Sequence, residues 1–223
     1  MCNIIIPEAF IIRTPDTPFP DITLALDEPN GLIAIGGDLS SERLISAYQQ
    51  GIFPWYSENE PVLWYSPNPR MVMTPDKLHI SRSLAKVLKS KQFEIKINTN
   101  FDSIIHHCKS VVRKEQNSTW IDEDMVRAYS ELHKQGVVKS VEVYQDNQLV
   151  GGLYGVSMGR VFFGESMFSL VSNASKVAFA YLVQKLGYEL IDCQVESAHL
   201  KSLGAFNIKR DVFIQQLQKL LLK

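Results

Sequence analysis

The pattern of apolar and polar positions changes character at about residue 70. After that point it is regular: residues 93–98 alternate apolar and polar side chains, which predicts a strand with one buried face. Behind Ser81, apolar positions follow at i, i+3 and i+4 spacing, which predicts a helix over about 82–90 with the Ser81 hydroxyl as its N-cap. The second part of the chain therefore reads as ordinary helices and strands.

The same reasoning predicts the other elements of this second part. They are a short strand at 71–73, helices at about 102–112 and 122–135, a hairpin of 141–145 and 148–158 turning at Asp146-Asn147, a third strand in 159–166, a helix at 174–186 capped by Asn173, a strand at 189–195, and short helices near 197–203 and 211–222. Helices, antiparallel strands, then helix and strand in this order are typical of an α+β sheet domain.

The first part of the chain is less regular. Residues 1–37 contain five prolines, so we expect short strands and tight turns there. Ser40 caps a predicted helix over about 41–50, and residues 51–70 hold two of the three tryptophans and four prolines, which predicts a rigid aromatic loop. We therefore expect a small N-terminal domain, 1–69, followed by a larger domain, 70–223.

Composition narrows the class of protein. With 223 residues, 45% of them hydrophobic and 21% charged, the chain is long enough for one or two globular domains. The start, MCNIIIPEAF, lacks the features of a signal peptide and no apolar run reaches about 20 residues, so we expect a cytoplasmic protein. Three cysteines without paired spacing predict neither a disulfide framework nor a zinc site, and we expect no metal and no cofactor.

The net charge of −1 hides an uneven distribution. Residues 1–61 carry nine acidic side chains and two arginines, whereas residues 77–114 carry nine basic side chains and two acidic ones. A basic segment of this kind is suited to contact phosphate groups, although a solvated helix face explains it equally well.

Candidate chemistry lies near the C-terminal end. Asp192 and Gln194 are two residues apart on a predicted strand, so their side chains should share one face, with Cys193 and Val195 on the other. Polar groups on an apolar strand must be exposed or hydrogen-bonded. One interpretation is a structural hydrogen-bond network; the other is a reaction centre in which a carboxylate orients an amide, with Glu165 as a third polar member.

Several segments together resemble one enzyme family. They are EPNGLIAIGGDLS (28–40), AYQQGIFPWYSENEPVLWYSPNPRMV (47–72), LHISRSL (78–84), TWI (119–121), VGGLYGV (150–156), VFFGESMFS (161–169), NASK (173–176), LIDCQV (190–195) and HLKSLGA (199–205). In these residues the chain resembles the leucyl/phenylalanyl-tRNA–protein transferases, in family order from about residue 17 to 215. The resemblance implies a small N-terminal domain and a larger GNAT-like acyltransferase domain with a mostly antiparallel central sheet flanked by helices.

The resemblance also implies an activity. The family moves Leu or Phe, and less readily Met, from aminoacyl-tRNA to the α-amino group of proteins that begin with Arg or Lys, which marks them for N-degron proteolysis. The expected partners are therefore aminoacyl-tRNA and such acceptor proteins, with no membrane. Carried over by position, Asp192 orients or relays at the reacting centre, Gln194 contacts the amine, and Glu165 lies near the α-amino group of the bound aminoacyl moiety. On these roles, replacing Asp192 by Ala should lower turnover much more than folding.

Three further sets of residues follow from the same resemblance. An apolar pocket for the aminoacyl side chain is expected from Leu153, Phe162, Met167, Phe179, Leu182 and Ile191. A stacking platform for the terminal adenosine of tRNA is expected from Tyr48, Trp55, Trp120 and Tyr129, because base stacking on aromatic rings tolerates any sequence. Acceptor-stem phosphates are expected at Arg82, Lys86 and Lys89. For each apolar or aromatic residue, an ordinary core position is the competing interpretation.

Some positions depart from the common family pattern, namely Ser118, Leu153, Leu170 and Lys209, but none is one of the three expected catalytic residues. Two other functions remain open at this point. One is a CoA-dependent N-acyltransferase of the GNAT type, although SLVSNASK lacks the glycines of a pyrophosphate-binding loop. The other is a catalytically silent module that binds RNA or peptide.

Overall fold

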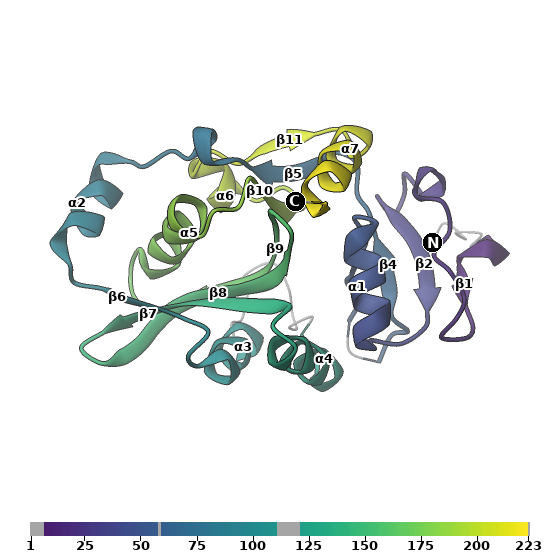
Figure 1. Cartoon of the computed structure of the whole chain (residues 1–223), viewed down its shortest axis with the longest axis horizontal. Helices are drawn as coiled ribbons and strands as arrows, with labels where there is room; N and C mark the ends of the chain where they lie inside the picture. The colour runs from purple at the N-terminus through teal and green to yellow at the C-terminus, as the bar shows by residue number, and fades with distance from the viewer. Residues whose placement is uncertain (1–6, 58, 111–120, 223) are drawn as a thin grey trace.

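The chain forms a small sheet and a large sheet that share apolar packing (Figure 1). The computed structural model describes residues 7–57, 59–110 and 121–222. The small sheet has the strand order β1-β2-β4-β3, and helix α1 (Ser41–Gln49) lies beside it. Its strands are β1 (Ile11–Ile12), β2 (Leu32–Gly36), β3 (Phe53–Pro54) and β4 (Leu63–Tyr65), and two short 3-10 helices, η1 (Glu8–Phe10) and η2 (Ile22–Leu24), complete this part.

The large sheet has seven strands in the order β11-β5-β10-β9-β8-β7-β6. They are β5 (Arg70–Met73), β6 (Glu94–Ile97), β7 (Val138–Gln145), β8 (Gln148–Met158), β9 (Val161–Ser169), β10 (Leu190–Gln194) and β11 (Phe206–Ile208). Every neighbouring pair is antiparallel except β9 and β10, which run parallel. The expected fold class, α+β with a mostly antiparallel central sheet, is confirmed.

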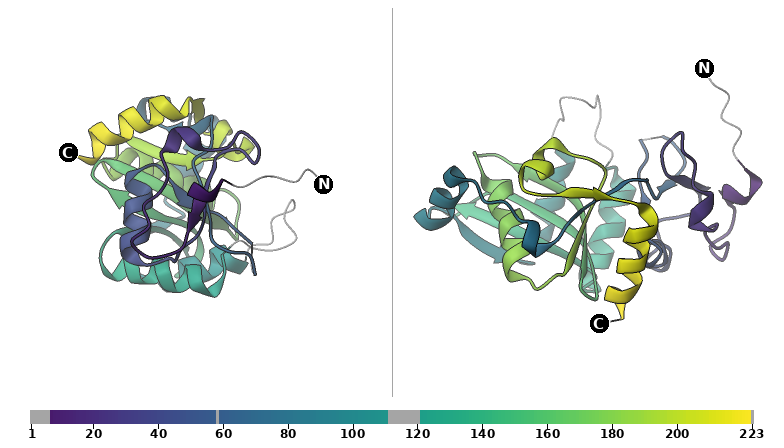
Figure 2. Two further views of the ribbon diagram at one scale, coloured as in Figure 1. Left: turned by 90° about the vertical axis from the view of Figure 1, so that its right-hand side faces the viewer. Right: turned by 90° about the horizontal axis from the view of Figure 1, so that it is seen from above.

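Helices cover both faces of the large sheet. Helix α5 (Ala174–Lys185) connects β9 to β10 and packs on one face, while α3 (Phe101–Ser110) and α4 (Glu123–Lys134) pack on the other (Figure 1). Helix α2 (Arg82–Ser90), preceded by the 3-10 turn η3 (Pro75–Lys77), touches α5 at the end of the molecule far from the small sheet. After the short helix α6 (Ala198–Ser202), helix α7 (Arg210–Leu221) lies at the junction of the two sheets, against α1 (Figure 2).

Local sequence signals explain where most of these elements begin and turn. The hydroxyls of Ser40 and Ser81 accept the N–H groups of Arg43 and Leu84, so both predicted N-caps are confirmed. Asp146 and Asn147 both have positive φ, 50° and 62°, which is the geometry of a tight two-residue hairpin turn. The predicted hairpin of β7 and β8 is therefore confirmed.

The predicted cap of α5 is wrong. Asn173 adopts φ 70°, and its side chain caps no N–H group. Instead the hydroxyl of Ser169, at the end of β9, accepts the N–H of Ser175 at 3.2 Å. The helix is thus capped from the strand that precedes it, which fixes the crossover between β9 and α5.

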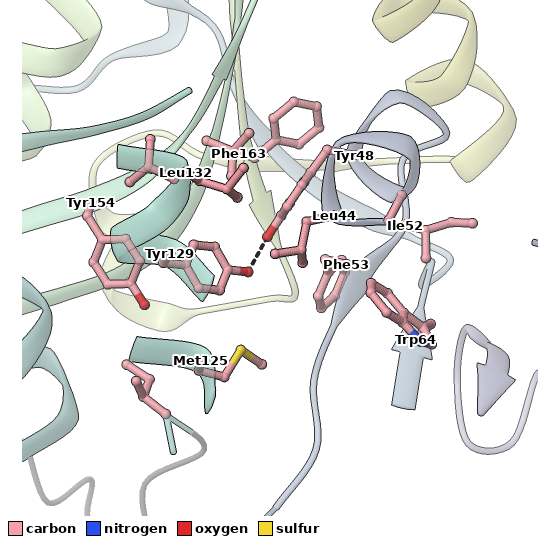
Figure 3. Packing of buried hydrophobic residues seen from close by; sticks show 14 of the residues in the cluster. Leu44, Tyr48, Ile52, Phe53, Trp64, Met125, Tyr129, Leu132, Tyr154 and Phe163 are labelled. Carbon is pink, nitrogen blue, oxygen red and sulfur yellow. Dashed lines mark hydrogen bonds between the residues drawn. The ribbon is translucent and has the colours of Figure 1, made fainter. Parts of the chain in front are cut away.

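Apolar packing continues across the predicted domain boundary. One cluster of buried residues joins Trp64 of β4, Tyr48 of α1, Tyr129 of α4 and Phe213 of α7. Figure 3 shows α1 and β4 side chains packed against those of α4 and β9. The division into 1–69 and 70–223 falls between the two sheets, and we retain it as a proposal, because the shared core makes their stabilities interdependent.

Helices long and apolar enough to cross a bilayer do not occur in the part of the chain that the structure describes.

Candidate active site

A β-bulge shapes the end of β10. Asp192 pairs with Val72 of β5 and Gln194 pairs with Met71, so Cys193 is an extra residue between two adjacent pairs. Gln194 adopts φ 62°, a left-handed conformation that is strained for a residue of this size. The simple alternation expected for this strand is therefore wrong, since Cys193 and Val195 line the same cavity as Asp192 and Gln194.

Asp192 is held by an arginine that sequence reasoning missed. Arg70, at the start of β5, donates from Nε to Asp192 Oδ1 at 2.8 Å and from Nη2 to Oδ2 at 2.6 Å. Both side chains are fully buried, with 0% exposure. Asp192 Oδ1 also accepts the backbone N–H of Gln194 at 2.9 Å, and this bond holds the bulge in its left-handed conformation. The ion pair thus fixes the position of Gln194.

Arg70 itself is enclosed by parts of the chain that are distant in sequence. Its Nη1 donates to the carbonyl of Gly51 at 3.0 Å. Its guanidinium lies 4.8 Å from the ring centre of Phe53 in β3 and 4.6 Å from that of Phe213 in α7. Contacts of a cation with ring faces stabilise it further. The small sheet, the large sheet and the last helix all meet at this side chain.

The buried ion pair changes the expectation for the Asp192→Ala variant. Removing one partner of a buried pair leaves an uncompensated charge, which typically costs about 3–5 kcal/mol of stability. The structure therefore changes this prediction: we now expect the Asp192→Ala substitution to lower both turnover and stability. The physical reason is Arg70, whose charge would remain in the core.

Glu165, on β9, lies next to this pair and accepts hydrogen bonds from neutral side chains. Its Oε1 accepts from Gln194 Nε2 at 3.0 Å, and its Oε2 accepts from the hydroxyl of Tyr129 at 3.1 Å. The side chain is 7% exposed, and burial raises the pKa of the carboxyl to about 7, against the opposing effect of hydrogen bonds from Tyr48 and Tyr129. It is therefore a carboxyl group that changes its protonation near neutral pH.

Tyr48 and Tyr129 are enclosed in the core. Both rings have 0% exposure, so neither presents a free face to a base in this structure, and their place in the adenosine site stays a prediction. Their hydroxyls are hydrogen-bonded to each other and extend the polar cluster from Glu165 toward α1 (Figure 3). Burial, together with the nearby Glu165 charge, raises the pKa of both hydroxyls well above the usual value, so both remain protonated donors.

A cavity of about 340 Å³ opens beside these polar groups. The size is suited to a small ligand or a side chain. All six residues of the expected apolar pocket line it, and so do all three expected catalytic residues: Leu153, Phe162, Met167, Phe179, Leu182, Ile191, Glu165, Asp192 and Gln194. Sequence reasoning missed the other lining residues, among them Ser166, Cys193 and His199. The cavity thus has an apolar wall from β8, β9, α5 and β10, and a polar end.

The residues expected to meet tRNA lie elsewhere. Arg82, Lys86 and Lys89 are exposed on α2 at i, i+4 and i+7 spacing, and therefore share one side of that helix. Trp55 is half-buried beside the small sheet, with its ring 5.7 Å from that of Tyr65 in an edge-to-face contact. Trp120 and Ser118 fall outside the described residues. Leu170 is 58% exposed.

The arrangement suits acyl transfer to an amine. An apolar cavity ends at an amide and at a carboxyl group with a pKa of about 7, and two tyrosine hydroxyls lie in the hydrogen-bond network behind that carboxyl group. The cavity can therefore hold an apolar side chain, and the carboxyl group can take up or release one proton beside it. Within the described ranges, no group of three or more His, Cys, Asp and Glu side chains is placed to hold a metal ion.

Comparison with known proteins gives a consistent result. A family model described as leucyl/phenylalanyl-tRNA protein transferase matches residues 72–218, and a model of that family's N-terminal domain matches residues 37–68. Three relatives carry the name leucyl/phenylalanyl-tRNA–protein transferase. They come from Nitrosomonas eutropha (55% identity over 94% of this chain and 92% of the relative), Nitrosospira multiformis (54%, over 92% and 89%) and Pseudomonas aeruginosa (53%, over 92% and 91%).

Solved structures give more distant matches. A GCN5-related N-acetyltransferase from Kribbella flavida has 10% identity and a TM-score of 0.36, and covers 73% of this chain and 59% of its own. The structure of L-PGS from Bacillus licheniformis has 10% identity and a TM-score of 0.41, with 74% and 54% coverage.

Proposed function

The chain belongs to the leucyl/phenylalanyl-tRNA–protein transferase family, and on that premise we propose that it moves Leu or Phe, and less readily Met, from aminoacyl-tRNA to the N-terminal amine of acceptor proteins. We further propose that the acceptors begin with Arg or Lys, that the product is marked for N-degron proteolysis, and that the enzyme works in the cytoplasm. The observation that carries the proposal is the cavity whose apolar wall ends at Glu165, Asp192 and Gln194.

The reaction needs positioning more than it needs a nucleophilic side chain. A free α-amine has a pKa of about 7.7–8.0, so part of it is neutral at pH 7 and attacks the ester carbonyl directly. Holding the two reactants together contributes up to about 7–11 kcal/mol in favourable models. In this arrangement Asp192 orients Gln194 through its backbone N–H, and the Gln194 amide contacts the amine.

Selectivity for the donor follows from the cavity wall. Leu153, Phe179 and Ile191 present apolar surface, which favours Leu, Phe and Met and disfavours charged side chains through the cost of desolvation. Between similar apolar groups such a wall discriminates by only about 1–3 kcal/mol per methylene group. Tolerance of several large apolar residues is therefore expected.

A CoA-dependent reaction is less well supported by the local geometry. Pyrophosphate groups bind free N–H groups at a helix N-terminus. At the start of α5, the N–H of Ser175 donates to Ser169 Oγ and the N–H of Ala174 donates to the carbonyl of Val171. These protein contacts occupy the donors that a CoA pyrophosphate would need.

One assay tests the proposed function. Purified protein is incubated with labelled Leu-tRNA or labelled acetyl-CoA, and with peptides that begin in Arg or in Asp. We expect label only from Leu-tRNA, and only on the Arg peptide. Label from acetyl-CoA would favour the acyltransferase alternative, and no label in any combination would favour a binding module.

The basic side of α2 gives a prediction for tRNA binding. Reversing Lys86 and Lys89 to Glu is expected to weaken tRNA binding at least about tenfold at low salt, because two phosphate contacts become repulsive. The slope of log affinity against log salt should fall by about 0.7–0.9 for each lost contact. Filter binding over a salt series measures both values. Reversal of Lys209 and Lys219 is the control for net charge, and an equal loss in that variant would contradict the assignment.

A further inference from the structure

The polar end of the cavity contains two buried carboxyl groups in different surroundings. Asp192 accepts three hydrogen bonds, two of them from a guanidinium, and has no exposed surface. Both of its oxygens are thus taken up by the pairing with Arg70 and the bond to the Gln194 backbone. Asp192 is therefore occupied as a fixed acceptor and is poorly suited to exchange a proton during a reaction.

Glu165 has the opposite surroundings. Its side-chain hydrogen bonds come from neutral donors, namely the Gln194 amide at Oε1 and the tyrosine hydroxyls of Tyr129 and Tyr48, so no cation occupies its oxygens through these bonds. It lines the cavity, and the structure fixes its direction from both sides, by Gln194 of β10 and by Tyr129 of α4. Of the two carboxyl groups, Glu165 is the one placed to take up a proton and release it.

We propose that Glu165 is the proton acceptor of the transfer reaction, and that Arg70 and Asp192 are positioning residues that act on it through Gln194. This inference rests on the proposed function. As the acceptor amine attacks the ester carbonyl, an N–C bond forms and the C–O bond to the tRNA ribose breaks. The proton lost by the amine passes to the Glu165 carboxylate and then to the leaving ribose oxygen, so the enzyme ends in its starting state.

The proposal predicts a pH dependence. Glu165 acts as a base only when ionised, so transfer should fall as the pH drops below about 7. The hydrogen bond from Tyr129 lowers the pKa of Glu165, so its removal should shift the acidic limb of the profile to higher pH. The titratable or charged groups that act directly on Glu165 are Tyr48 of α1, Tyr129 of α4, Arg70 of β5 and Asp192 of β10. Tyr154 of β8, Cys193 of β10 and His199 of α6 line the same cavity.

The acceptor amine itself ionises in a similar range, with a pKa of about 7.7–8.0. The comparison is therefore made between variants with one and the same peptide, because the pKa of that amine in solution does not change. A shift of the acidic limb between wild type and Tyr129→Phe is then caused by a titrating group of the enzyme and not by the peptide amine.

The test measures single-turnover transfer from saturating labelled Leu-tRNA to a peptide that begins in Arg, between about pH 5.5 and 9. We expect Glu165→Gln to lower the rate constant at least about 100-fold, with a folded protein by circular dichroism and a cooperative thermal transition. We expect the acidic limb of Tyr129→Phe to move to higher pH than that of wild type.

Glu142 supplies the matched control. It is also a fully buried glutamate of the large sheet, and its Oε1 accepts from the N–H groups of Thr99 and Asn100 at 2.7 and 2.8 Å. It does not line the cavity. We expect Glu142→Gln to alter thermal stability but to leave the rate constant within about twofold and the acidic limb in place. An equal rate loss in both glutamine variants would mean that Glu165 acts through folding.

Two results would overturn the inference. In the first, Glu165→Gln raises the KM for Leu-tRNA and leaves the saturated rate unchanged, which would make the carboxylate an anchor for the donor's α-ammonium group. Leu-tRNA deaminated with nitrous acid checks this, because a donor with a hydroxyl in place of the amine should then be insensitive to the substitution. In the second, Tyr129→Phe leaves the limb unmoved. If wild type transfers nothing at all, the proposed function fails instead, so the two failures are distinguishable.

Discussion

Replacing Asp192 by Ala should lower the free energy of unfolding by about 3–5 kcal/mol, because the fully buried Arg70 guanidinium loses the carboxylate that pairs with it. Transfer should be lost as well, because Gln194 loses the acceptor that holds its strained backbone. Urea titration followed by tryptophan fluorescence measures the stability, and the transfer assay measures the rate. Loss of activity at unchanged stability would contradict the buried ion pair.

A double substitution separates stability from activity. Arg70→Met with Asp192→Leu removes both charges and fills the space with apolar groups, an exchange that is often neutral or stabilising for buried pairs. We expect the free energy of unfolding of this double variant to be at least that of Asp192→Ala and closer to that of wild type, while transfer remains absent. If the double variant regained transfer, the ion pair would have only a structural role.

The second large effect concerns donor selectivity. Leu153→Phe adds a ring to the wall of a cavity of about 340 Å³, so it should penalise the bulkier Phe donor more than Leu. We expect the ratio of kcat/KM for Phe-tRNA to that for Leu-tRNA to fall by about 10- to 200-fold. Competition between the two charged tRNAs, with mass spectrometry of the peptide product, gives this ratio directly.

The opposite change on the facing helix is the control for selectivity. Phe179→Leu, on α5, makes room in the same cavity and should move the ratio toward Phe. A common loss of both donors in the two variants, without a change in their ratio, would indicate damage to the core and not a specificity wall. It would also contradict the assignment of the cavity to the aminoacyl side chain.

Much of the large sheet was predictable because its signals are local. The hydroxyl of Ser81, the Asp146-Asn147 turn and the alternation of residues 93–98 each act within a few residues. The small sheet was predictable only as irregular structure. Strands β1 and β3 contain two residues each, which is too short for any periodicity, and β1 pairs in parallel with β2 across about twenty residues.

The residues of the candidate site also divide into those that the sequence predicted and those that it did not. The resemblance correctly named residues that the structure gathers around one cavity, although their roles remain proposals. Arg70 lies within one of the segments that carry the resemblance (47–72), but no role was assigned to it, because its partner Asp192 is 122 positions away and a lone arginine before an apolar strand gives only a weak signal of burial. The bulge at Cys193 could not be predicted, because a strand is expected to point successive side chains to opposite faces unless a local signal indicates otherwise. Tyr48 was expected as a platform because composition gives no measure of enclosure.

The position of Phe213 has a consequence for biosynthesis. This ring from α7 forms one side of the enclosure around Arg70, opposite Phe53 from a strand made more than 150 residues earlier. Residue 213 must therefore be synthesised before the Arg70 guanidinium is fully enclosed and Asp192 is held in its final position. A nascent chain that stops short of this helix would possess every side chain of the cavity and still lack a finished reaction centre.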